Sequence, residues 1–69
     1  MIKVTNIALD DVRKEAKVSL FADSTGDATT DTTLIDGFPK GYKIAFGSSI
    51  ITADGDMAFF KSTGQWNWV

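Results

Sequence analysis

Residues 50–69 constrain the fold most, because they contain two glycine turns between three short runs of β-forming residues. The first turn centres on Asp54-Gly55, a dipeptide typical of β-hairpins, since a type I′ turn needs positive φ at both central residues. A three-residue loop over 53–55, in which only Gly55 is left-handed, fits the same sequence. The residues leave these two alternatives open.

The second turn is more restrictive and determines a register. A two-residue type I′ turn would place Thr63 at positive φ, which a β-branched side chain resists. A three-residue loop over 62–64 needs positive φ only at Gly64. We therefore predict a type I turn followed by a glycine bulge, with Lys61 facing Gln65.

This register distributes the apolar residues of the C-terminal meander over both faces of the sheet, because opposed residues share a face. One face carries Ala58, Phe60, Trp66 and Trp68, and the other carries Met57, Phe59, Asn67 and Val69. Both faces are largely apolar, so both need a cover. The rest of the chain can cover one face, and a second subunit can cover the other.

The first part of the chain also reads as strand and turn. Alternating residues near the N-terminus predict a first strand within 1–9, and a charged turn leads to a second strand over 16–22. Val12, Ala16 and Leu20 have helical spacing, but alternation within 16–22 favours the strand.

Turn-forming residues dominate the middle of the chain. Residues 23–31 have loop composition and form the segment most expected to be mobile. A short strand is expected at 32–35, a tight glycine-flanked connection at 36–41, a strand at 42–46 and a break or bulge at 47–49. In the strand at 42–46, Tyr42, Ile44 and Phe46 share one face.

The strand pattern predicts an all-β fold, either a small antiparallel sheet or a partly closed barrel, ending in the three-stranded C-terminal meander. The 69 residues make a single domain, 1–69. A domain this small is marginally stable, and natural examples add disulfides, a metal or oligomerisation. Cysteine is absent, so no disulfide is possible, and histidine is absent, which removes the commonest zinc ligands. Formation of a homo-oligomer is the remaining way to stabilise the domain.

Few residues of this sequence are suited to catalysis or to metal binding. Histidine and cysteine are absent, which excludes nucleophile–histidine catalysis and the commonest zinc ligands. Asp54-Gly55-Asp56 resembles part of a calcium loop, but the only glutamate, Glu15, lies far upstream. We predict no catalytic residue, no metal site and no cofactor. The candidate interface or ligand face consists of Phe60, Trp66 and Trp68, and core or interface roles are favoured over a stacking platform for a ligand.

Charge and hydropathy restrict the binding partners and the cellular location that we expect for the protein. The net charge of −2 and the pI near 4.7 argue against nucleic acid, which calls for a basic face. No apolar run approaches the roughly 20 residues of a membrane span. The N-terminus lacks a signal-peptide pattern, so we expect the chain to be kept initially in a cytoplasm-like compartment.

The second half of the chain resembles small structural proteins of tailed bacteriophages and prophages, of the head-fibre or head-decoration type. The matching residues are Gly47-Ser48-Ser49, Asp54-Gly55 and Lys61-Ser62-Thr63-Gly64-Gln65-Trp66, with the approach Ile35-Asp36-Gly37-Phe38-Pro39-Lys40-Gly41-Tyr42. The resemblance implies a virion component, present in the host bacterial cytoplasm before assembly, that binds other virion proteins such as the capsid and has no enzymatic activity. It transfers no binding residue, because the motif residues mainly build turns. The alternative is a small β binding module that presents Trp66 and Trp68 to a carbohydrate or peptide.

Overall fold

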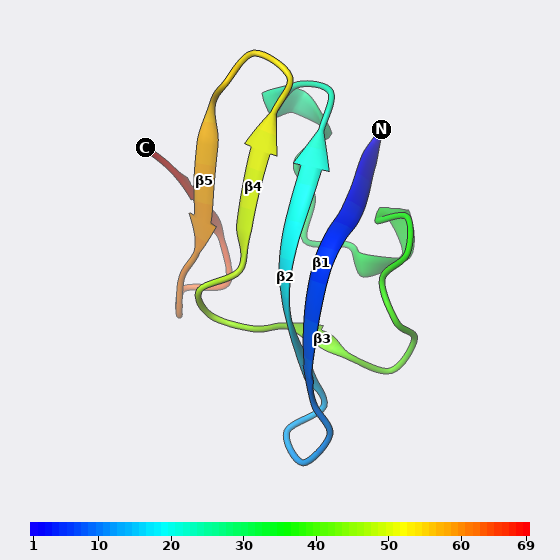
Figure 1. Cartoon of the computed structure of the whole chain (residues 1–69). Helices are drawn as coiled ribbons and strands as arrows, with labels where there is room; N and C mark the ends of the chain where they lie inside the picture. Colours follow the sequence, from blue (N-terminus) through cyan, green and yellow to red (C-terminus); the bar gives the residue numbers. More distant parts are fainter.

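One open sheet of six strands forms the body of the molecule, as the computed structural model of residues 1–69 shows (Figure 1). The strands are β1 (Ile2–Asp10), β2 (Glu15–Ala22), β3 (Lys43–Ile44), β4 (Ser49–Thr52), β5 (Met57–Phe60) and β6 (Trp66–Trp68). Two 3₁₀ turns, η1 (Thr25–Asp27) and η2 (Thr32–Leu34), lie between β2 and β3. The all-β class and the C-terminal meander are confirmed.

The sheet differs from the expected antiparallel sheet or partly closed barrel in two respects. Its order is β1-β2-β4-β5-β6, with β3 also beside β2, and β2 runs parallel to both β3 and β4. The sheet therefore is mixed, and its edge strands β1 and β6 do not meet. The reason is the long connection after β2, because a crossover of a dozen or more residues can return the chain in the same direction.

The hairpin of β1 and β2 follows the predicted strand–turn–strand pattern and contains an unpredicted bulge. Its register shifts between Val4 and Asn6, so Thr5 is the extra residue. The bulge changes which residues face the core. Ile2 and Val4 lie opposite Ala22 and Leu20, whereas beyond the bulge Ile7 and Leu9 lie opposite Val18 and Ala16. All of these apolar residues consequently belong to the same face.

The connection from η1 to β3 covers that inner face of the sheet, and in Figure 1 it passes behind the sheet and then runs beside β1. Ile35 is buried in this connection, and Phe38 and Tyr42 pack partly buried against the core. The expected strand at 32–35 is wrong, because these residues form the 3₁₀ turn η2. Asp31 caps the start of η2, and its side chain accepts the N–H of Thr33. The buried core is Ile2, Ala16, Val18, Leu20, Ala22, Ile35, Ile44, Ile50 and Phe60.

The predicted break at 47–49 falls between β3 and β4 on the same side of β2, although β4 already begins at Ser49. Gly47 has φ of 84°, and the fully buried Ser48 fills the gap in the ladder. The Ser48 hydroxyl accepts the N–H of Val18 at 3.0 Å, in place of a backbone carbonyl of the neighbouring strand. The break is therefore closed by a side chain.

The meander has the predicted register. Ala58 pairs with Trp68 and Phe60 with Trp66, and the N–H of Lys61 reaches the carbonyl of Gln65 at 3.3 Å. Gly64 has φ of 79°. In the first turn only Gly55 has positive φ, and the N–H of Thr52 bonds to the carbonyl of Asp56, so the three-residue loop over 53–55 is the one formed.

Candidate functional site

Trp66 is held within the domain by two contacts. Its ring packs edge-on against Phe60, with ring centroids 5.0 Å apart and an interplanar angle of 65°. Its Nε1–H donates to the carbonyl oxygen of Thr29 at 2.9 Å, which joins the meander to the crossover connection. Trp66 is half-buried, so it acts as part of the cover of the inner face.

Trp68, the other predicted face residue, lies further along the same face of β6 with Ala58 as its cross-strand neighbour. Its side chain is 40% exposed, and no hydrogen bond holds its indole N–H. Of the three residues in the predicted face, Phe60 and Trp66 thus contact each other, while Trp68 is the most exposed.

The opposite side of the sheet is open. We define the outer face as Phe21, Ile51, Met57 and Phe59. Phe21, Ile51 and Met57 are consecutive neighbours across β2, β4 and β5, and Phe59 lies one row away beside Ser49. Ile51 is 45% exposed, Met57 37% and Phe59 40%. An apolar row across three strands is a contiguous patch, which in soluble proteins commonly marks a binding surface.

A groove lies on the side of the sheet that the crossover connection covers. Its volume is about 470 Å³, and it is lined by Glu15, Thr30, Thr32, Tyr42, Lys43, Ile44, Phe46, Phe60 and Gly64. Sequence alternation predicts one shared face for Tyr42, Ile44 and Phe46, and all three line this groove. The regular strand at this point is only Lys43–Ile44, however, so Phe46 stands beyond its end.

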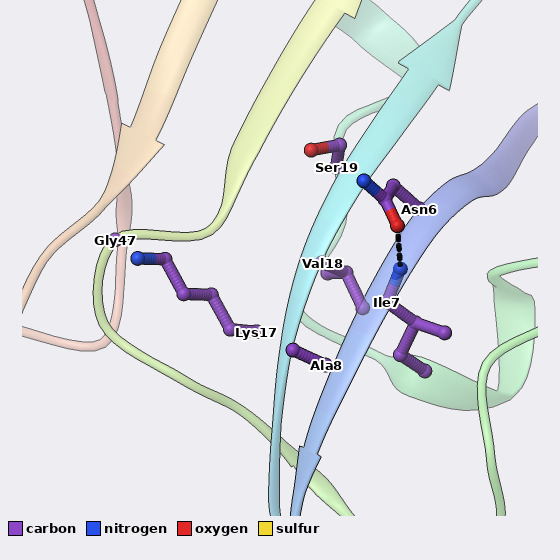
Figure 2. Close-up of a pocket in the computed structure, with 7 residues that line it drawn as sticks. All are labelled: Asn6, Ile7, Ala8, Lys17, Val18, Ser19 and Gly47. Atoms are coloured by element: carbon purple, nitrogen blue, oxygen red, sulfur yellow. Dashed lines mark hydrogen bonds between the residues drawn. The ribbon is translucent and has the colours of Figure 1, made fainter.

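A smaller cavity of about 180 Å³ lies over the β1 bulge (Figure 2). Figure 2 shows the Lys17 side chain reaching toward Gly47, and the Asn6 side-chain oxygen accepting the N–H of Ile7 at 2.9 Å. A Cβ on Gly47 would meet the Lys17 stem at 3.3 Å, so Gly47 lets this side chain lie across the loop. The cavity therefore lies just past the bulge, between β1, β2 and the loop at Gly47.

Asp10, Asp11, Asp23, Asp27 and Asp31 use their carboxylates in contacts within the chain. No group of three or more acidic side chains comes together to form a metal site. Hydrogen bonds from the Thr33 hydroxyl and N–H lower the pKa of Asp31, as expected for a capping carboxylate. The hydrogen bond from the terminal ammonium of Met1 lowers the pKa of Asp27. Asp54 and Asp56 flank Gly55 in the first meander turn.

The fold and these surfaces define a small all-β domain with one open apolar sheet face and one aromatic groove. Comparison with protein-family models, curated proteins and solved structures finds no significant match. No helix in the structure is sufficiently long and apolar to cross a membrane.

Proposed function

We propose that this protein is a non-enzymatic structural protein of a phage or prophage virion, of the head-fibre or head-decoration type. It acts by binding other virion proteins, the capsid first among them, through the outer face. The observation that supports this mode of action is the apolar row across neighbouring strands, in which Ile51 and Met57 are exposed and Phe21 is half-buried. The virion assignment rests on the resemblance carried by the turn residues.

The turn residues that carry the resemblance also determine the course of the backbone between the last three strands. Gly47, Gly55 and Gly64 all have positive φ, so the resemblance follows the backbone positions that shape β4, β5 and β6. Two of these strands, β4 and β5, carry most of the outer face. The matching residues therefore support a shared scaffold for presenting that face.

The size of the outer face suits attachment in many copies. It is a patch of four side chains, whereas stable interfaces bury roughly 800 Å² on each partner. A single contact of this kind is weak, but a repetitive capsid surface offers many sites to an oligomer and raises the effective affinity. Binding to a symmetric lattice is the setting in which such a small patch suffices.

The alternative, in which Trp66 and Trp68 stack on a ligand, has less support. The ring and the indole N–H of Trp66 are both engaged within the domain, by Phe60 and by the Thr29 carbonyl. A ligand platform needs a free ring face with nearby polar groups. Trp66 therefore fits a structural role better.

The test is to purify particles of the phage or prophage that encodes the chain and to look for the protein by mass spectrometry. Light scattering gives the solution mass of the isolated protein in parallel. We expect the protein in purified particles at many copies per capsid, and co-sedimentation of added protein with capsids that lack it. Particles that contain none of the protein, and capsids that do not bind it, would refute the proposal.

A further inference from the structure

Phe46 has an exposed ring on a fixed backbone. Its side chain is 61% exposed, although it borders the hydrophobic core at Ile44 and Phe60. The backbone on both sides of it is hydrogen-bonded, since the N–H of Ala45 reaches Ala16 and the N–H of Gly47 reaches Phe60. The ring thus lies at the groove on a backbone that is hydrogen-bonded on both sides.

Four polar side chains around the groove have no partner within the chain. The three ion pairs of the structure join Met1 to Asp23, Met1 to Asp27 and Arg13 to Asp10, which leaves Glu15 and Lys43 free. The side-chain hydrogen bonds of the nearby loop involve Thr29, Asp31 and Thr33, which leaves Thr30 and Thr32 free. The groove therefore offers two hydroxyls beside an open ring, and the cross-strand neighbours Glu15 and Lys43 add a carboxylate and a cation at its rim.

This set of groups matches one ligand chemistry. A pyranose has an apolar C–H face and a rim of hydroxyls that both donate and accept hydrogen bonds. The negative face of an aromatic ring attracts polarised C–H groups, while Lys43 can donate, Glu15 can accept and the threonines can do both. The volume of about 470 Å³ lies within the range of small-ligand sites.

We infer that this groove binds a pyranose unit of a neutral oligosaccharide, with Phe46 as the stacking ring. Tyr42 is a less suitable platform, because the Lys14 ammonium already lies 5.4 Å from its ring centroid and its hydroxyl bonds to Asp11. The sugar site is on the opposite side of the sheet from the outer face. It therefore adds a second activity to capsid attachment and does not depend on it.

The test titrates the labelled whole protein with maltohexaose, cellohexaose, chitohexaose and mannohexaose, followed by amide chemical shifts. We expect at least one sugar to shift amides of 30–32, 43–47 and 64 together. Phe46→Ala should weaken that binding roughly tenfold, the upper range for one aromatic contact, and Phe46→Trp should retain it. Leu34→Ala is the matched control, since Leu34 is 66% exposed but does not line the groove.

Three results would overturn the inference. The first is that none of the four sugars moves the groove amides. The second is that Phe46→Ala, shown by its melting curve to be folded, binds as well as the parent. The third is that a proline-rich peptide moves these amides while the sugars do not, which would assign the groove to peptide recognition.

Discussion

The hydroxyl of Ser48 takes the place of a strand beside Val18. Its oxygen accepts the Val18 N–H at 3.0 Å and lies 3.5 Å from the Ala16 carbonyl oxygen, to which it donates. Both Ser48 and Val18 are buried, so water cannot replace these bonds. The hydrogen bonds of this one side chain thus continue the parallel pairing along β2 between the part paired with β3 and the part paired with β4.

Ser48→Ala should destabilise the domain by about 1–3 kcal/mol, because it leaves the buried N–H of Val18 without an acceptor. Chemical denaturation measures the loss. Ser49→Ala is the control, since Ser49 is only half-buried and its hydroxyl makes no hydrogen bond within the chain. Equal stability of the two variants would show that the Ser48 hydroxyl does not support the ladder.

Trp66→Ala should cost about 3 kcal/mol, the lower end of the range for large aromatic truncations, because the ring is half-buried. Trp66→Phe should cost about 1 kcal/mol, since it keeps the contact with Phe60 but loses the bond to the Thr29 carbonyl. Thermal melting of both variants, with Trp68→Ala for comparison, tests this order. A larger loss for Trp68→Ala than for Trp66→Ala would contradict it.

Gly64→Ala should cost about 1–2 kcal/mol, the penalty for a Cβ in the left-handed region. Gly64 has φ of 79° and open space around it, so the cost is conformational and not steric. Gly26→Ala serves as the control, because Gly26 does not have positive φ and its nearest neighbour would be 3.7 Å away. We expect that variant to be neutral or slightly stabilised in the same melting experiment.

The phenol of Tyr42 should titrate above its ordinary pKa of 10.0, because it donates a hydrogen bond to the Asp11 carboxylate. A raised pKa in the folded state means that this contribution to stability is full below pH 10 and is lost as the pH rises through the folded value. Tyr42 is the only tyrosine, so tyrosinate absorbance reports it directly. Asp11→Asn should lower the measured pKa; no change would mean that Asp11 is not the cause.

The meander could be predicted from sequence because its geometry depends on local backbone rules. Gly64 is the residue suited to the left-handed position, and that choice alone pairs Phe60 with Trp66. The sequence does not decide the length of the first turn, because Asp54 tolerates the positive φ that a two-residue type I′ turn would require of it. Only the structure, with positive φ at Gly55 alone, decides between the two.

The parallel pairing of β2 with β4 could not be predicted in the same way. It depends on where residues 23–42 cross the sheet, and turn composition does not encode that path. The apolar positions do hold one usable signal, since they change from even numbers at Ile2 and Val4 to odd numbers at Ile7 and Leu9, which marks the Thr5 bulge. The sequence does not predict the groove, although it does predict that Tyr42, Ile44 and Phe46, which all line it, share one face.

Co-sedimentation of two variants with capsids tests whether the outer face is the surface that makes the proposed contact with another virion protein. Ile51→Lys places a charge in the middle of the outer face, at a side chain already 45% exposed, so the fold should tolerate it. Val12→Lys places the same charge on the β1–β2 turn, where the side chain is 95% exposed. We predict that Ile51→Lys abolishes co-sedimentation with capsids while Val12→Lys binds like the parent. Equal binding of both variants would show that the outer face is not the surface that binds capsids.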